Sequence, residues 1–242
     1  MIDSLLLAVT RVITQRGDAE LTNATGFFFR RADKLFLITA RHVIVDEPSG
    51  HRPDCLTIEF HTDPQNVAAT CNITFPLHDH GHPIWRESAD AAGLVDVAAV
   101  ELNPTELPSK LFIHAFTERN LIDGMHQIEI GTPVLNVAFP LGFHDTLHHL
   151  PVVRHAVISS VYGLRFQGQG YFLTDGQMHR GSSGAPVVMR AAPKNPCGKD
   201  LPWVLLGIHA LRMDVSNRDF GQDGCFNLNC AWYSNILVSL TQ

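Results

Sequence analysis

The feature that most limits how this chain can fold is the shortness of its apolar segments, which are separated by turn-forming residues. The segments are rich in Val, Ile, Phe and Thr, which favour strands, and most are too short for a buried helix. This pattern predicts an all-β protein of sandwich or barrel type. The segments are residues 26–29, 35–40, 56–60, 95–102, 133–139, 152–160, 170–174, 185–189 and 204–210.

Three other segments complete the predicted organisation. We interpret residues 1–11 as the first strand, because they contain a short apolar stretch. Residues 103–126 are richer in proline, charged and loop-forming residues, so we expect them to connect two β units. Residues 233–242 are the best candidate for a helix. The 242 residues contain no internal repeat and suffice for one compact unit or two small halves that share an interface.

A serine in a glycine-flanked turn is the most informative chemical feature. Residues 181–187 are Gly-Ser-Ser-Gly-Ala-Pro-Val, with Ser183 at the third position. A hydroxyl is a poor nucleophile unless a base removes its proton and donors stabilise the oxyanion that forms. Glycine allows successive backbone N–H groups to point into one small space. Alone, such a serine is usually an ordinary loop residue, so a nucleophile also requires a base and an acid elsewhere.

Candidates for the base and the acid lie at strand-like segments. His42 follows the apolar run 35–40, and Asp96 lies within the apolar run 93–102. A carboxylate in an apolar strand is costly to bury without a partner. Asp90 ranks lower as the acid, because its surroundings have the composition of a polar loop. The order His42, Asp96, Ser183 differs from that of nucleophile-elbow hydrolases and of subtilisins.

Three blocks together resemble the signature of the chymotrypsin-fold, or trypsin-like, serine peptidases. The blocks are Thr-Ala-Arg-His-Val at 39–43, Asp-Val-Ala at 96–98 and Gly-Ser-Ser-Gly-Ala-Pro at 181–186. They are most similar to the bacterial trypsin-like group, which includes the glutamyl endopeptidases and the heat-stress proteases. Two positions depart from the pattern: Ser182 stands where Asp or Asn is common, and Ala185 stands where a second glycine is common. Both residues are small, so the turn remains possible.

The resemblance implies one peptidase domain over residues 1–242, built from two packed six-stranded antiparallel β-barrels with a short C-terminal helix. The first barrel would span 1–102 and the second 127–242, joined by the connection 103–126. The active site would lie in the cleft between the barrels.

The resemblance also assigns roles to residues. It implies that Ser183 attacks the scissile carbonyl, that His42 takes the hydroxyl proton, and that Asp96 orients the imidazole. The segment Gly181-Ser182-Ser183 would form the oxyanion hole, with the N–H groups of Gly181 and Ser183 as donors.

The sequence carries a weaker indication of substrate preference. In the resembling family the floor of the specificity pocket lies six residues before the nucleophile; here that residue is Gln177, which gives no charge to pair with Lys or Arg. The segment Gly207-Ile208-His209 is similar to the segment at the same place in glutamyl endopeptidases and in the chymotrypsin-fold cysteine proteases of RNA viruses. An imidazole N–H can bond a carboxylate or an amide oxygen, so we expect His209 to select Glu or Gln before the cut. The alternative is a strand histidine satisfied by a neighbour.

Composition excludes several other classes. The net charge of −6 argues against a nucleic-acid-binding protein. The N-terminus lacks the positive charge and length of a signal peptide or membrane span, and the five cysteines are odd in number, so we expect a cytoplasmic protein with free thiols. No cofactor or metal is expected. His78, His80 and His82 could chelate a metal, but we prefer to interpret their segment as an exposed loop. We interpret His144, His148 and His149 in the same way, with the alternative that they line the substrate cleft.

These observations predict a serine endopeptidase that acts on a protein or peptide, possesses no membrane segment, and is open to control by a regulatory partner protein. The main alternative is a catalytically silent interaction module with the same fold. An esterase-like hydrolase is a third possibility, although the Gly-x-Ser-x-Gly elbow of the α/β-hydrolases is absent.

Overall fold

The computed structural model describes residues 2–122, 128–191, 201–213 and 227–242. Within these residues the protein is almost entirely β, and its only α-helices are the short α1 (Arg41–Ile44) and α2 (Ile236–Leu240). The predicted all-β class is therefore confirmed. The predicted C-terminal helix is present as α2, inside the expected segment 233–242.

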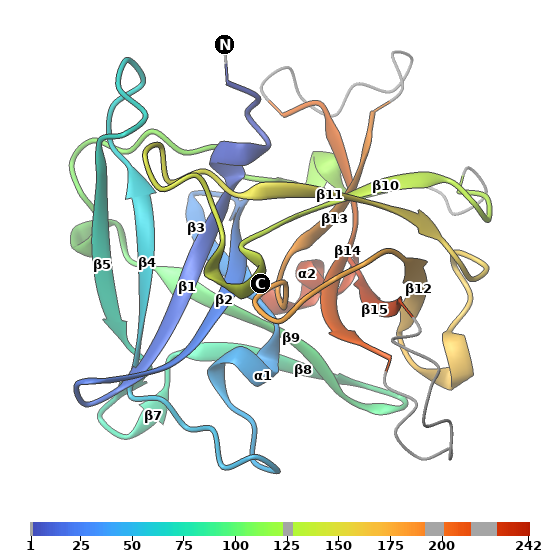
Figure 1. Ribbon diagram of the computed structural model, residues 1–242. Coiled ribbons are helices and arrows are strands. Elements are labelled where there is room, and N and C mark those ends of the chain that lie inside the picture. The colour runs from blue at the N-terminus through green and yellow to red at the C-terminus, as the bar shows by residue number, and fades with distance from the viewer. Residues whose placement is uncertain (1, 123–127, 192–200, 214–226) are drawn as a thin grey trace.

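The N-terminal half forms one antiparallel seven-stranded sheet, drawn in blue to green in Figure 1. In spatial order its strands are β5 (Thr70–Pro76), β4 (Cys55–His61), β1 (Val9–Arg16), β2 (Ala19–Arg31), β3 (Lys34–Thr39), β9 (Gly93–Leu102) and β8 (Trp85–Asp90). A separate small hairpin pairs β6 (His78–Asp79) with β7 (His82–Pro83).

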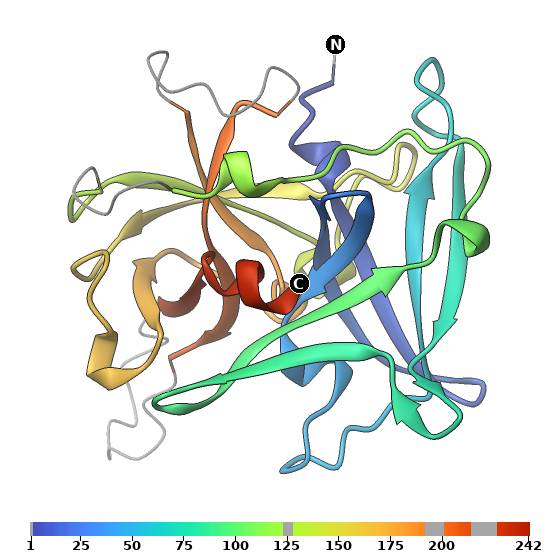
Figure 2. The same cartoon turned by 180° about the vertical axis from the view of Figure 1, so that it is seen from behind.

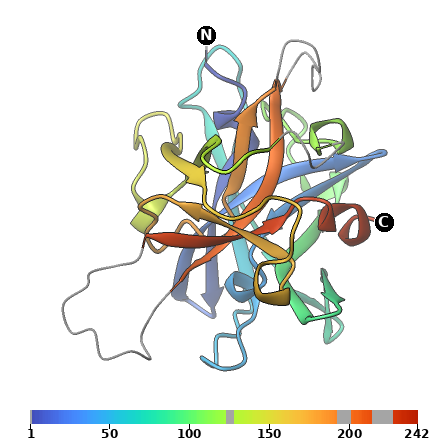
Figure 3. The ribbon, with the colours of Figure 1, turned by 90° about the vertical axis from the view of Figure 1, so that its right-hand side faces the viewer.

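The C-terminal half forms a closed six-stranded antiparallel barrel, which faces the viewer in Figure 3. Around the barrel the strands are β10 (Pro133–Ala138), β11 (Val152–Ile158), β12 (Tyr171–Asp175), β15 (Leu228–Tyr233), β14 (Trp203–Arg212) and β13 (Pro186–Arg190), which pairs again with β10.

The structure differs from the expected pair of six-stranded barrels in the N-terminal half. Its sheet has seven strands, and in the described part of the chain the edge strands β5 and β8 do not pair with each other. The first strand also begins later than expected: residues 6–8 form a 3₁₀ turn, and β1 starts at Val9. Residues 103–122, which were expected to connect the halves, contain two 3₁₀ turns and no strand longer than an isolated bridge; residues 123–127 lie outside the described residues.

Three apolar clusters hold the halves and join them. One fills the N-terminal sheet and includes Phe28 and Phe60, whose rings stack. Another fills the C-terminal barrel around Phe172. The third lies between the halves, where residues such as Phe27 of β2 and Ile208 of β14 share one buried cluster. Because each fully buried large apolar side chain contributes roughly 1.5–3 kcal/mol, this shared core fixes one half against the other.

Helix α2 also spans the join between the halves. It follows β15 of the C-terminal barrel and packs against β8 and β9 of the N-terminal sheet, as the view from behind shows (Figure 2). Its Leu237 and Leu240 are buried in the shared cluster. The end of the chain thus helps to position β9, the strand that carries Asp96.

Candidate active site

The residues predicted as acid, base and nucleophile form a continuous hydrogen-bonded chain, with the base in the middle. The Nδ1 atom of His42 is 2.8 Å from Oδ2 of Asp96, and Nε2 of His42 is 2.9 Å from Oγ of Ser183. The backbone N–H of His42 also donates to Oδ1 of Asp96 at 2.9 Å. Both carboxylate oxygens of Asp96 are therefore used to fix the position and rotation of the imidazole.

Strand pairing explains why the base and the acid meet. Strand β3 pairs antiparallel with β9, with Thr39 opposite Ala98. His42 lies in α1, the single turn that follows β3, and Asp96 lies two residues before Ala98 on β9. The two apolar strands thus bring the histidine and the acid to the same edge. Both side chains remain partly accessible, at 35% for His42 and 20% for Asp96.

The environment of His42 raises its pKa above the usual value. Burial of the ring disfavours the charged imidazolium, but the hydrogen bond and the negative charge of Asp96 outweigh this effect, and Asp46 adds a smaller attraction. The ring is thus a stronger base than a free imidazole. A base with this partner can accept a proton from a hydroxyl bonded to its other nitrogen.

The turn that carries Ser183 leaves two backbone donors free. The N–H of Ser182 donates to the carbonyl of His179 at 3.1 Å, and the N–H of Gly184 donates to a carbonyl of β14 at 2.8 Å. The N–H groups of Gly181 and Ser183 have no hydrogen-bond partner among the described residues. Buried backbone donors are rarely left unpaired. An oxyanion that accepted from both donors would satisfy them.

The carbonyl groups of this turn are held in place from outside it. The N–H of Leu141 donates to the carbonyl of Arg180 at 2.6 Å. The Thr25 hydroxyl donates to the carbonyl of Gly181 at 2.7 Å, and the Thr25 N–H donates to the carbonyl of Ser183 at 3.0 Å. A trans peptide points its N–H and C=O in opposite directions, so the N–H of Gly181 points away from Leu141.

Two positions in the turn require glycine. Gly181 has φ +89°, and a Cβ there would lie 2.6 Å from the carbonyl oxygen of Phe139. Gly184 has φ +86°, and a Cβ there would lie 2.1 Å from the carbonyl oxygen of Thr25. Side chains are strained at such φ angles, and neither contact involves a flexible group that could give way. The turn is therefore packed directly against the backbone of both halves.

Ser182 differs from its expected place in the oxyanion tripeptide. Its N–H is used by His179, so Ser182 offers no free backbone donor. Its side chain is fully buried, and its Oγ has no partner among the described residues. The available donors are thus the two N–H groups of Gly181 and Ser183.

The Ser183 hydroxyl has two acceptors for one proton. Its Oγ lies 2.9 Å from Nε2 of His42 and 3.0 Å from the carbonyl oxygen of Ala210 on β14. Rotation about the Cβ–Oγ bond directs the proton to one or the other. Proton transfer to the base requires the first arrangement.

His209 is buried beside the nucleophile. Its backbone N–H donates to the carbonyl of Ala185, which places β14 alongside the residues that follow Ser183. The side chain is 3% exposed, and its Nδ1 has no partner among the described residues. Burial lowers the pKa of His209 to about 4, with a further contribution from the charge of His42. The ring is therefore neutral near pH 7, with unused hydrogen-bonding capacity.

The other predicted specificity residues do not gather around His209. Gln177 follows β12 and is exposed, and no hydrogen bond among the described residues joins it to His209. Ile208 is buried in the cluster between the halves. Packing explains why residue 207 is a glycine, because a Cβ there would lie 2.7 Å from the Phe172 ring. Residues 214–226, which follow this strand in the sequence, lie outside the described residues.

The other predicted histidine segments lie outside the Ser183 site, and their histidines are exposed or contact neighbouring residues there. The segment 78–82 is an exposed hairpin, and among the described residues no group of three or more His, Cys, Asp and Glu is arranged to hold a metal. His148 pairs with Asp145 at 2.7 Å, and His149 pairs with the buried Glu59 at 2.8 Å. The ring of His144 packs between those of Phe139 and His149.

Asp90 and the three cysteines that the structure describes make no contact with the Ser183 site. Residues 87–92 form the end of the β8–β9 hairpin rather than a loop, and Asp90 pairs with Arg165 at 2.8 Å. Cys55, Cys71 and Cys230 are free thiols, and Cys197 and Cys225 lie outside the described residues. Within the described chain, no helix has the length and apolar character needed to cross a membrane.

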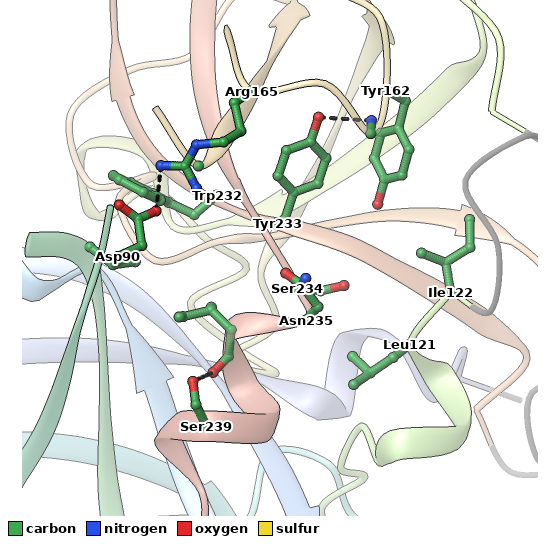
Figure 4. A pocket seen from close by; sticks show the side chains of 14 residues that line it. Asp90, Leu121, Ile122, Tyr162, Arg165, Trp232, Tyr233, Ser234, Asn235 and Ser239 are labelled. Carbon is green, nitrogen blue, oxygen red and sulfur yellow. Dashed lines mark hydrogen bonds and ion pairs between the residues drawn. The ribbon is translucent and has the colours of Figure 1, made fainter. Parts of the chain in front are cut away.

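A cavity of about 490 Å³ lies behind the acid and was not anticipated from the sequence (Figure 4). Its wall includes Val95, the residue before Asp96, and three aromatic rings. The ion pair between Asp90 and Arg165 crosses one side of it. The residues that line it come from both halves, so no local motif could have marked it. The aromatic rings are those of Tyr162, Trp232 and Tyr233.

Comparisons with known proteins show the family and the fold of the chain. The profile of the family described as trypsin-like peptidase domain matches residues 24–192. A serine endoprotease from Yersinia pestis superposes with a TM-score of 0.55 at 17% identity over 98% of this chain, which spans 62% of that protein. The inactive form of a serine-to-alanine mutant of an M. tuberculosis protein gives 0.51 at 13% identity, over 98% of this chain and 86% of that one. At such low sequence identities, the structural similarity shows a shared fold. No curated protein matches the sequence.

Proposed function

Because the chain belongs to the family of trypsin-like peptidase domains, we propose that it is a serine endopeptidase that hydrolyses peptide bonds in proteins or peptides, with Ser183 as nucleophile. The observation that carries the proposal is the continuous contact from Asp96 through His42 to Ser183, at 2.8 and 2.9 Å. Two free backbone donors on the same turn support it.

The proposed reaction begins with proton transfer from Oγ of Ser183 to Nε2 of His42, as Oγ bonds to the carbonyl carbon of the substrate. The carbonyl oxygen becomes an oxyanion and accepts hydrogen bonds from the N–H groups of Gly181 and Ser183. Asp96 holds the Nδ1 proton and stabilises the imidazolium. The imidazolium then protonates the leaving amine as the C–N bond breaks. Water attacks the acyl-enzyme with His42 as base, which releases the acid and restores Ser183.

We further propose that the enzyme prefers Glu or Gln before the cut. The support is His209, a buried neutral imidazole beside the nucleophile whose Nδ1 has no partner among the described residues. A neutral ring has one N–H to donate, and either a carboxylate or an amide oxygen can accept it. The exposed Gln177 supplies no negative charge for a Lys or Arg side chain.

Labelling with a fluorophosphonate probe tests the chemistry. The probe should react with the wild-type protein and with Ser239→Ala, which alters an exposed serine of α2, but it should not react with Ser183→Ala. Folded wild-type protein that neither reacts with the probe nor cleaves peptides would instead support the silent interaction module.

Cleavage of a peptide library tests the preference. We expect Glu or Gln to be enriched before the cut, and His209→Ala to lose this enrichment. A preference for Lys, Arg or large apolar residues would contradict the proposed role of His209.

A further inference from the structure

We propose that Thr25 is a positioning residue that holds the oxyanion donors of the turn in their working orientation. This inference rests on the proposed peptidase function and deepens it. Thr25 lies on β2 of the N-terminal sheet, whereas Gly181 and Ser183 lie in the C-terminal half, 156 and 158 residues further along the chain. Thr25 is fully buried and does not contact Oγ of Ser183 by any hydrogen bond in the described residues.

The Thr25 hydroxyl bridges two backbone groups of the C-terminal half. It donates to the carbonyl of Gly181 at 2.7 Å and accepts from the N–H of Phe139 at 3.0 Å. The hydroxyl hydrogen and a lone pair are thus both used. Phe139 is two residues before Leu141, whose N–H holds the carbonyl of Arg180. One side chain therefore connects both segments that surround the Gly181 peptide groups.

The backbone of Thr25 adds a second grip on the same turn. Its N–H donates to the carbonyl of Ser183 at 3.0 Å. Its own carbonyl accepts from the hydroxyl of Thr39 at 2.8 Å, which ties it to the end of β3 just before His42. Thr25 thus holds the carbonyls of the two residues whose N–H groups are free. It also links the turn to the strand that leads to the base.

This arrangement has a physical consequence for the oxyanion donors. Gly181 has no Cβ, so its backbone dihedrals have more freedom than those of other residues, and the turn needs external contacts to stay in one orientation. With the carbonyl of Gly181 bonded to Thr25 and the carbonyl of Arg180 bonded to Leu141, both peptide groups that flank Gly181 are held, so the N–H of Gly181 keeps one orientation. Donors that are fixed before the reaction stabilise the oxyanion without a reorganisation cost.

A matched pair of substitutions tests the proposal. Thr25→Val keeps the shape of the side chain and removes the hydroxyl bridge. Thr10→Val is the control, because the buried Thr10 hydroxyl likewise donates to a backbone carbonyl, at 2.8 Å, and accepts from a backbone N–H, at 3.3 Å, both of Glu59. Each substitution unpairs one buried N–H and one buried C=O, so the two variants should lose similar thermal stability. Thr10 lies on β1, bonds to Glu59 of β4, and makes no hydrogen bond to the turn among the described residues.

The kinetic readouts separate positioning from stability. For Thr25→Val we expect kcat to fall on the order of ten-fold or more with KM nearly unchanged, because the lost interaction matters only in the transition state. The affinity for a peptide aldehyde inhibitor should fall in parallel. Thr25→Ser retains the hydroxyl and should restore most of kcat. Thr10→Val should keep the kcat of the wild type, with active enzyme counted by fluorophosphonate titration.

Each outcome decides the proposal. A fall in kcat for Thr25→Val that Thr25→Ser reverses would support it. Equal kcat in Thr25→Val and Thr10→Val, or a comparable fall in folded Thr25→Ser, would overturn it while leaving the peptidase function intact. If Thr25→Val does not fold, Thr25→Ser against Thr10→Val still decides, because the retained hydroxyl must retain kcat. A folded wild-type protein without cleavage or labelling would overturn the peptidase function and this inference together.

Discussion

The two halves of the molecule contribute to the site in different ways. The N-terminal sheet contributes His42 and Asp96, whose side chains are already bonded to each other. The C-terminal half contributes Ser183, whose Oγ bonds to His42, and donors that lack partners in the described chain: the N–H groups of Gly181 and Ser183, and the buried ring of His209. The proton-transfer groups are therefore complete without a substrate. The groups that would bind the substrate are completed only when it arrives.

His42, which is partly exposed, and His209, which is buried, show the same contrast in their pKa values. His42 has a carboxylate partner, and its pKa is raised although burial opposes the charge. His209 has no such partner, and burial lowers its pKa to about 4. The difference teaches that a neighbouring carboxylate decides whether the pKa of an imidazole in this site is raised or lowered.

Asp96→Asn removes the carboxylate that the N-terminal half contributes, and it should have the largest effect on kcat. An amide in this position favours the wrong tautomer of His42, so we expect kcat to fall by roughly 10⁴-fold. The acid limb of the pH–rate profile should also move to lower pH, because Asp96 is what raises the pKa of His42. Asp79→Asn, in the exposed β6–β7 hairpin, is the control. A loss of less than ten-fold would contradict the role of Asp96.

Gly181→Ala disturbs the backbone donors that the C-terminal half contributes. The new Cβ would meet the carbonyl oxygen of Phe139 at 2.6 Å and displace the N–H of residue 181. We expect kcat to fall on the order of 10²-fold. Gly50→Ala is the matched control, because Gly50 also has a positive φ, +72°, but a Cβ there has nothing within 4 Å. Equal kcat in the two variants would contradict the donor role of Gly181, because the collision would then have no consequence for catalysis.

The pH dependence of stability sharpens the comparison of the histidines. The pKa of His209 is below that of an unfolded histidine, so the unfolded state binds more protons between about pH 4 and 6.5. Stability should therefore fall as the pH drops through this window, and His209→Gln should flatten the slope. His42 has the opposite effect in the wild type, because its raised pKa contributes stability below about pH 6.5 that is lost as the pH rises through the folded value. His42→Gln should therefore remove this loss of stability with rising pH. Urea unfolding at several pH values measures both slopes, and an unchanged slope in His209→Gln would contradict the burial argument.

Local sequence was sufficient to predict the all-β class and to choose the three residues that meet at the site, because each lies in a short segment with a strand beside it. It misjudged the surroundings of Asp90, since residues 87–92 have the polar composition of a loop yet end an edge hairpin whose outer face is exposed. It also could not predict seven strands in the N-terminal sheet, because strand pairing is decided between distant segments.

Thr25 marks the same limit inside the site. Its residue type is ordinary for a strand, and its contact with Gly181 spans 156 positions of the chain. Such a contact depends on how the two halves dock, which no local pattern encodes. The resemblance had already named Gly181 and Ser183 as donors, but only the structure shows that their N–H groups are free while those of Ser182 and Gly184 have acceptors.

Arg165→Ala tests the far side of the join between the halves and should have the smallest effect. Its ion pair with Asp90 at 2.8 Å crosses the cavity wall, but the two side chains are 41% and 21% exposed. Such pairs contribute about 0–1 kcal/mol, so the melting temperature should change by only a few degrees, and less in high salt. Asp90→Asn should behave alike, with kcat unchanged in both. A large loss of kcat would show that this wall also positions Asp96, which lies next to the cavity-lining Val95, and that the apolar core between the halves is not sufficient to hold the acid in place.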